Sequence, residues 1–150
     1  MVSLPAKVHL VLVGDGEDKE VLKQKARALG LAGRIHFFGW CDNLAWMYGG
    51  VDLVVNCSKN EGTPVSLLEA LAAGLPVLAA PVGGIPEVLQ QVNTGTLLKG
   101  ITAEKISNGL RSCLADLSQR APSEENRQSI VKSFSPESLV QRVESLYQKS

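Results

Sequence analysis

Short apolar runs alternate with amphipathic segments along most of the chain. The runs end at glycine, proline or polar residues, which is typical of buried strands followed by tight loops. They predict strands at residues 8–13, 35–38, 52–57, 76–80 and 96–98, the last at a sheet edge. Between the runs, apolar residues recur at helical spacing. This spacing predicts helices at residues 17–29, 43–48, 64–73 and 86–91.

Individual residues give two of these helices an expected face and an expected end. Val21, Leu22, Ala26 and Leu29 share one side of the helix expected at 17–29. Asp42 is the candidate cap of the short helix that follows, because its carboxylate can accept a hydrogen bond from a first-turn N–H.

After residue 102 the predicted strands stop and helices follow. Helical spacing covers residues 103–118 and 123–133, and Ser135 and Pro136 suit the cap and the first position of a last helix. The apolar face of that last helix comprises Leu139, Val143 and Leu146.

Strands alternating with helices predict an α/β fold, a Rossmann-like three-layer sandwich with a mostly parallel sheet. The length of 150 residues fits one domain, residues 1–150. In such sheets ligands bind beyond the carboxyl ends of the strands. The candidate sites are therefore the loops at residues 14–16, 39–42, 58–63 and 81–85.

Composition narrows the classes of function. Fifteen Lys and Arg residues balance fifteen Asp and Glu residues, so the formal net charge is zero. This balance removes the electrostatic argument for a general nucleic-acid binder. No apolar run approaches the ~20 residues that span a bilayer. Three cysteines without a Cys-x-x-Cys pair indicate reduced thiols and a cytoplasmic protein.

A metal site is not expected from this sequence. The two histidines, His9 and His36, lie in predicted strands, where packing or edge positions are the simpler interpretation. The cysteines are scattered and form no ligand pattern.

The loop at 58–63 and the helix after it hold the most informative side chains. Glu61 lies at the mouth of a predicted strand, and Gly62 lets the backbone approach a ligand closely. The helix beginning at Pro64 directs its N-terminus, a natural anion site, at the same space. Glu69 could accept the two hydroxyl hydrogens of a ribose. A sugar nucleotide fits this combination.

The simpler alternatives are a solvated loop acid for Glu61 and an exposed helix acid for Glu69. The neighbours of Glu69 weigh against the second alternative, because Leu67, Leu68, Ala70 and Leu71 are all apolar. We therefore expect Glu69 to be partly buried and to have a partner.

Five motifs in one order resemble the retaining glycosyltransferases with the GT-B fold, notably family 4. Glu61 to Glu69 resembles the Glu-x7-Glu motif of that family. The other four are a Gly-Asp-Gly strand end, a Phe-x-Gly turn, a helix-to-strand passage and a Gly-Gly-x-x-Glu loop. They lie at residues 14–16, 37–39, 69–77 and 83–87. The match runs from about residue 8 to 99, and the terminal helix fits less well.

The resemblance implies a C-terminal, donor-binding domain that holds a nucleotide diphosphate sugar. Glu61 would contact the donor sugar beside the reacting centre, as the candidate catalytic residue, and Glu69 would hold the ribose. The family transfers a hexose with retention at the anomeric carbon and generally needs no metal or other cofactor. The further contacts implied for the nucleotide sugar are Gly14, Gly39, Trp40, Gly62, Thr63 and Val65.

The chain also departs from the family pattern. Residues 1–7 contain no counterpart of the family's first donor-domain strand with its basic loop, and we expect 150 residues to leave no room for the family's acceptor-binding N-terminal domain. The resemblance therefore implies an incomplete domain with a gap in its sheet and open strand edges. Pro64 also lacks an N–H, so the backbone groups of Thr63 and Val65 carry more of the expected contacts.

Two functions stay open at this point. The first is the donor-binding part of a glycosyltransferase that is inactive without a partner, either an N-terminal glycosyltransferase domain or a second copy. The second is a stand-alone binding or assembly module without catalysis. We expect a nucleotide sugar as ligand and no nucleic acid. The sugar, the base and the acceptor stay open, and a peripheral membrane acceptor is one alternative.

Overall fold

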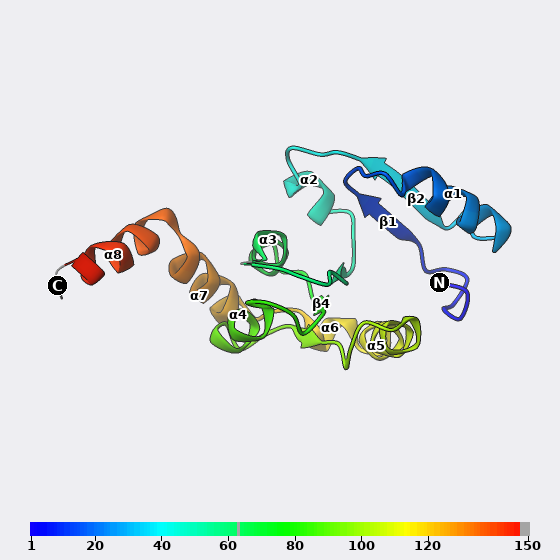
Figure 1. Cartoon of the computed structure of the whole chain (residues 1–150). Coiled ribbons are helices and arrows are strands. Elements are labelled where there is room, and N and C mark those ends of the chain that lie inside the picture. The colour runs from blue at the N-terminus through cyan, green and yellow to red at the C-terminus, as the bar shows by residue number, and fades with distance from the viewer. Residues whose placement is uncertain (63, 148–150) are drawn as a thin grey trace. The chain divides into compact units, whose positions relative to one another are not determined.

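Parallel strands alternate with helices in the computed structural model, as the sequence predicts (Figure 1). The structure describes residues 1–62 and 64–147. The chain divides into two compact units, Met1–Trp46 and Met47–Ser150.

The unit Met1–Trp46 contains a two-stranded parallel sheet. Strands β1 (Leu10–Val13) and β2 (Ile35–Gly39) pair with Leu10 opposite Ile35, and helix α1 (Lys19–Ala28) connects them. All three elements lie within the predicted ranges or one residue beyond them. Ala26 of α1 lines one surface depression together with Ile35 and Phe37, so α1 lies on that face of the sheet.

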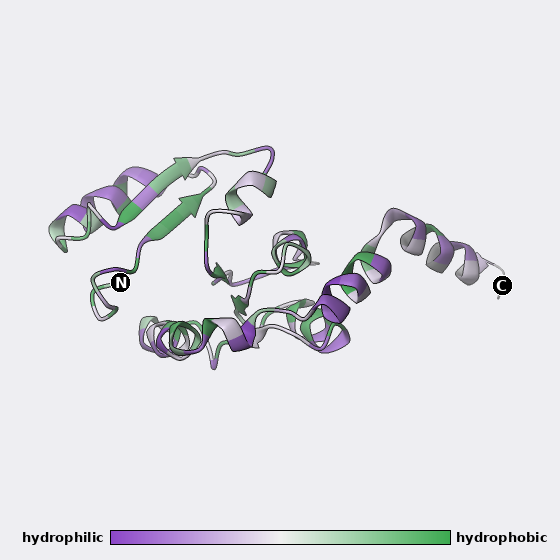
Figure 2. Ribbon diagram, turned by 180° about the vertical axis from the view of Figure 1, so that it is seen from behind, coloured by the Kyte–Doolittle hydropathy of each residue, from purple (hydrophilic) through white to green (hydrophobic). Residues whose placement is uncertain are grey.

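The opposite face of this sheet is largely exposed within the unit, although the Phe38 ring lies against that of Trp46, with 5.2 Å between the ring centroids. Because side chains alternate between faces along a strand, the residues between those beneath α1 point away from the helix. Val11, Val13 and Phe38 have exposed fractions of 37%, 41% and 49%. The expectation of a buried strand at 8–13 is therefore wrong. Figure 2 shows how apolar the two strands are compared with α1.

The expected apolar face of α1 is also largely uncovered. Ala26 is buried, but Val21, Leu22 and Leu29 are 61%, 44% and 51% exposed. A two-stranded sheet offers α1 too narrow a surface to cover its whole apolar side. The four residues share one side of α1, as the spacing predicts, but only Ala26 is buried.

The short helix α2 (Ala45–Tyr48) begins two residues later than predicted. Asn43, rather than Asp42, supplies the capping oxygen, which accepts a hydrogen bond from the Ala45 N–H at 2.9 Å. Asp42 instead accepts a hydrogen bond from the indole N–H of Trp40. The expected cap is therefore wrong by one residue, because Asp42 has a closer donor.

The unit Met47–Ser150 contains a three-stranded parallel sheet in the order β3-β4-β5. The strands are β3 (Val54–Asn56), β4 (Val77–Ala79) and β5 (Thr96–Leu97). Strand β5 lies at the edge, as predicted. The helices are α3 (Val65–Ala72), α4 (Ile85–Gln91), α5 (Ala103–Ala115), α6 (Leu117–Arg120), α7 (Glu124–Phe134) and α8 (Pro136–Tyr147).

The last helix begins where the sequence predicts it, whereas the helix predicted at 103–118 is interrupted at Asp116, between α5 and α6. Helix α8 begins at Pro136, and the Ser135 hydroxyl accepts a hydrogen bond from the Ser138 N–H at 3.2 Å. The side chains of Leu139, Val143 and Leu146 lie outside the described part of the structure. Every helix within residues 1–62 and 64–147 is too short or too polar to cross a lipid bilayer.

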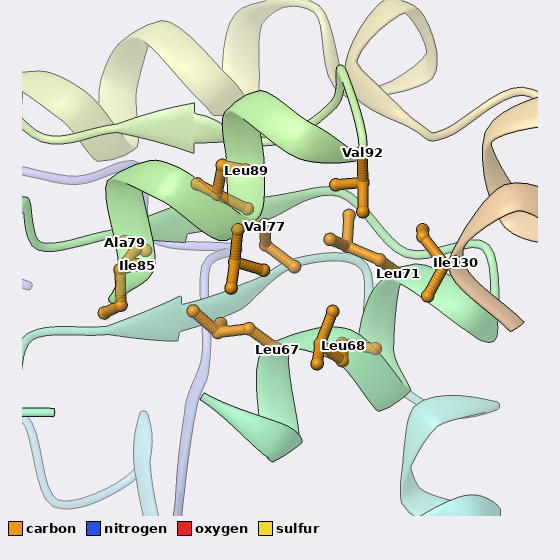
Figure 3. Packing of buried hydrophobic residues seen from close by; sticks show 11 residues of the cluster. Leu67, Leu68, Leu71, Val77, Ala79, Ile85, Leu89, Val92 and Ile130 are labelled. Carbon is orange, nitrogen blue, oxygen red and sulfur yellow. The ribbon is translucent and has the colours of Figure 1, made fainter. Parts of the chain in front are cut away.

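The core of this second unit lies on both faces of β4. On one face, apolar side chains from α3, α4 and α7 interlock with those of β4 (Figure 3). On the other face, Leu78 packs with Leu98 and with Cys113 of α5. Gly109 permits this close approach, since a Cβ there would lie 2.6 Å from the Leu98 side chain. Strand β4 is therefore covered on both sides, as the sandwich prediction requires.

Among the described residues, β1 pairs only with β2, and β3 pairs only with β4. Strands β1 and β3 therefore belong to separate sheets, and each presents one edge without a strand partner among the described residues.

Candidate functional site

Glu61 is held from the end of strand β3. The side-chain amide nitrogen of Asn56 donates a hydrogen bond to Glu61 Oε1 at 2.8 Å. The amide oxygen of Asn56 accepts one from the Ser58 N–H at 3.0 Å. A backbone N–H can only donate, so this second bond fixes which end of the amide faces Glu61. Asn56 thereby ties the half-buried Glu61 carboxylate to the sheet.

These donors also set the charge of Glu61. The Ser58 side chain, followed by the Asn56 amide, lowers the pKa of Glu61 below its ordinary value. A donor favours the ionised form of a carboxylate because only that form offers every lone pair as an acceptor. At neutral pH the Glu61 side chain is therefore an anionic acceptor. It suits sugar hydroxyls and developing positive charge, not proton donation.

The loop that follows β4 lies directly against the backbone of Glu61. A Cβ placed on Gly83 would lie 1.7 Å from the Glu61 carbonyl oxygen, and Gly83 has a φ of +54°. A Cβ on Gly84 would lie 2.9 Å from the Gly62 oxygen. Only glycine fits both the contact and the backbone conformation at position 83. The loops at the carboxyl ends of two parallel strands therefore meet at Glu61, where the fold class predicts a ligand site.

Glu69 lies on the outer side of α3 and is exposed. The expected partial burial is wrong, because Leu67, Ala70 and Leu71 fill the inner side of the helix and leave Glu69 on the outside. The expected partner exists nevertheless. The Tyr48 hydroxyl lies 3.0 Å from Glu69 Oε2 and 3.2 Å from the Ser66 carbonyl oxygen, so its single proton has both acceptors within hydrogen-bond distance, the carboxylate the closer of the two. Burial and the contact with Glu69 raise the pKa of Tyr48.

The three candidates in the unit Met1–Trp46 lie at the ends of its two strands. The Gly14 N–H donates a hydrogen bond to the Gly39 carbonyl oxygen at 2.6 Å, and both residues have positive φ, +114° and +88°. Trp40 follows directly and is 75% exposed. The structure therefore brings Gly14 and Gly39 together and leaves the Trp40 ring accessible.

The remaining candidates belong to the unit Met47–Ser150 with Glu61 and Glu69. Gly62 is exposed, and Val65 is the exposed first residue of α3. Thr63 lies outside the described residues. In the part of the chain that the structure describes, no three His, Cys, Asp or Glu side chains gather as metal ligands.

Sequence reasoning missed the residues that hold the two glutamates. Asn56 carried a signal, since it is a lone amide at the end of the apolar run Leu53-Val54-Val55. Ser58 and Tyr48 carried no comparable signal, because a serine in a polar loop and a tyrosine in a short helix are both ordinary. Their contacts appear only once the fold brings α2 and β3 to the motif.

Known proteins resemble the chain over most of its length. Residues 3–130 match the family model described as glycosyl transferases group 1. N-acetyl-alpha-D-glucosaminyl L-malate synthase of Bacillus anthracis is 34% identical over 139 residues, which are 92% of this chain and 36% of the synthase. The chain thus spans little more than a third of the length of that relative.

Solved structures also match most of this chain while the match covers only part of their own length. Anabaena Alr3699/HepE in complex with UDP-glucose superposes with a TM-score of 0.85 at 26% identity, over 99% of this chain and 43% of that one. The C-terminal domain of LpcC, a glycosyl transferase group 1 family protein of Francisella tularensis, superposes with a TM-score of 0.68 at 27% identity. This match covers 84% of this chain and 69% of that one. The fold is that of the C-terminal half of GT-B glycosyltransferases. The chain belongs to the glycosyl transferases group 1 family.

Proposed function

We propose that this chain binds a nucleotide diphosphate sugar, as the donor-binding part of a retaining glycosyltransferase. One observation carries the proposal: an ionised Glu61 is fixed where the loops after β3 and β4 meet. The family membership supports it, and the related HepE structures contain UDP or UDP-glucose at 25% and 26% identity.

Each candidate residue has a part in this proposal that follows from its chemistry. Glu61 accepts hydrogen bonds from hydroxyls of the donor sugar and stabilises positive charge at the anomeric carbon. The first N–H groups of α3, including that of Val65, face the diphosphate, for which a helix N-terminus is favourable. Glu69 accepts hydrogen bonds from the ribose, with Tyr48 holding its Oε2. Gly14, Gly39 and Trp40 serve the nucleoside.

Transfer to an acceptor is a further part of the proposal. The chain spans 36% of the synthase and 43% of HepE, and we assign acceptor binding to a partner, an N-terminal glycosyltransferase domain. In that case the chain alone binds the donor and transfers nothing. The uncovered sheet face at Val11, Val13 and Phe38 favours a second candidate, an assembly module that keeps the fold without catalysis.

Calorimetric titration of the purified chain tests donor binding. UDP, GDP, ADP, UDP-glucose and GDP-mannose are compared, and we expect one base to be preferred. Glu69→Ala should weaken nucleotide binding by ~1.5–3 kcal/mol, the worth of a hydrogen bond to a charged group. Glu125→Ala removes an exposed acid from α7 and is the matched control for the change in charge. Unchanged affinity in a folded Glu69→Ala variant would contradict the ribose assignment.

The same titration separates the two candidate functions. Selective binding supports the donor site. No heat of binding at millimolar ligand, with native far-UV circular dichroism, contradicts donor binding by this chain and favours the assembly module. A separate assay identifies the partner: if turnover appears only after an N-terminal glycosyltransferase half is added, that half is the partner.

A further inference from the structure

Strand β3 ends at Asn56, whose side chain bonds to the following loop and not to the neighbouring strand. The backbone of Asn56 pairs with β4 opposite Ala79, and its carbonyl oxygen accepts a hydrogen bond from the Ala80 N–H at 2.9 Å. The strand therefore closes with backbone groups alone. The side chain of Asn56 is half-buried and turns instead to the loop that carries Glu61.

The side-chain contacts of Asn56 have a fixed direction. Its amide oxygen is committed to the Ser58 N–H at 3.0 Å, so its amide nitrogen must face Glu61 Oε1 at 2.8 Å. One amide thus spans the loop, accepting from its beginning and donating near its end. A shift of the loop or a rotation of the Glu61 side chain breaks at least one of these bonds.

The backbone of Glu61 has a separate support. Gly83 and Gly84 pack against the carbonyl groups of Glu61 and Gly62 so closely that a Cβ at either position would overlap them. The contacts of the glycine loop that fix Glu61 are therefore contacts with its backbone. A glutamate side chain has several rotamers, and restricting them costs conformational entropy. The donors on Asn56 and Ser58 make that restriction.

We propose that Asn56 is a positioning residue, which holds the Glu61 carboxylate in the one orientation that receives the donor sugar. It acts on the sugar only through Glu61. The inference rests on the proposed function for the identity of the ligand, whereas the contact between Asn56 and Glu61 is tested without any ligand. Its distinguishing consequence is that the sugar half of the donor depends on Asn56 and the nucleotide half does not.

The first experiment measures the titration of the Glu61 carboxyl group by carbon-detected NMR. The variants are Asn56→Ala, which removes the donor, and Asn56→Asp, which keeps the shape and the acceptor for the Ser58 N–H but replaces the donor with a charge. We expect the pKa of Glu61 to rise in both variants, and more in Asn56→Asp because a second carboxylate lies beside it. Asn60→Asp, which adds the same charge at an exposed position of the same loop, is the matched control.

The second experiment compares affinity for UDP-glucose with affinity for UDP by calorimetry. Asn56→Ala should weaken UDP-glucose binding about tenfold and UDP binding less than about twofold, on the scale of one hydrogen bond to a charged group. Asn60→Asp should change the ratio of the two affinities little. Should the strand tolerate neither change at Asn56, Ser58→Ala removes the other donor outside the sheet and should shift the ratio in the same direction.

The outcomes distinguish this inference from the function on which it rests. An unmoved Glu61 pKa in folded Asn56 variants, or equal weakening for UDP and UDP-glucose, overturns the positioning role. If the wild-type chain binds neither ligand, the proposed function fails, and the NMR titration alone decides whether Asn56 holds Glu61. A raised Glu61 pKa together with a sugar-specific loss of affinity supports both.

Discussion

The two units of the chain use the same alternation of strand and helix and bury very different amounts of apolar surface. In Met47–Ser150, Leu67, Leu71, Leu78 and Ile85 have no exposed surface. In Met1–Trp46, the apolar side chains described as buried are Leu4, Ala26 and Leu31, each with 4–7% exposed. The difference lies in the sheets. Strand β4 is covered on both faces, whereas the sheet of β1 and β2 carries α1 on one face.

The ion pairs of the first unit do not replace the missing burial. Lys19 contacts Asp15 at 3.3 Å and Lys23 contacts Glu20 at 2.6 Å, and both carboxylates are largely exposed to solvent. Exposed pairs of this kind contribute little to stability, because water and salt screen the attraction between the charges. A two-stranded sheet is marginally stable in water without further packing. The pattern of apolar and polar residues therefore specifies each element, whereas stability depends on what covers both faces of the sheet.

The largest expected effect is a difference in hydrogen exchange between the two sheets. Amides of β4 should exchange only through global unfolding, whereas those of β1 should also exchange through local opening of the first unit. We expect β1 amides to exchange at least about 100-fold faster than β4 amides, measured by mass spectrometry on the dilute chain. Equal protection would contradict the comparison and show that the open face is covered in solution. Light scattering on the same sample then tests for a second copy.

Replacing one leucine by alanine in each unit should give the next largest difference between the two units, measured as the loss in the free energy of unfolding. Leu71 is fully buried in the core of the second unit, so Leu71→Ala should lower the free energy of unfolding by ~2–5 kcal/mol. Leu22 is 44% exposed on α1, so Leu22→Ala should change it by about 0.5 kcal/mol or less. Urea denaturation monitored by circular dichroism gives both values. A comparable loss in the two variants would mean that the apolar face of α1 packs against something in solution.

The sequence predicts the elements well because their signals are local. The strand at 77–79 and the helix at 124–134 lie inside or within one residue of their predicted ranges. Burial is less predictable, as Val21 and Glu69 show. Periodicity identifies the apolar side of a helix, but whether another element covers that side depends on sheet width. Both Val21 and Glu69 lie on helices whose surroundings the sequence does not specify.

In the candidate site, too, some features are predictable from the sequence and others depend on contacts that only the fold creates. The Glu61 and Glu69 positions follow from spacing and resemblance, and the glycine loop at 83–84 is part of the same pattern. The hydrogen bond from Tyr48 to Glu69 joins residues 21 positions apart, and local spacing contains no information on such a contact. The bond from Asn56 to Glu61 is closer in sequence, yet it depends on the loop conformation that Gly83 and Gly84 impose.

Adding a methyl group at one glycine in each unit gives the smallest of these effects and tests the packing directly. At Gly83 the added Cβ meets the Glu61 backbone, and the positive φ disfavours alanine by roughly 1–2 kcal/mol before any overlap is relieved. Gly83→Ala should therefore lower the free energy of unfolding by at least about 1–2 kcal/mol and displace Glu61.

Gly16→Ala is the counterpart in the first unit. A Cβ there meets no other atom within 4 Å, so its effect on the free energy of unfolding should stay within about 0.5 kcal/mol. Thermal unfolding of both variants measures the difference, and the Glu61 carboxyl titration reports the displacement. If Gly83→Ala leaves both the melting temperature and the Glu61 pKa unchanged, the loop after β4 does not press on Glu61, and Asn56 and Ser58 alone support that glutamate.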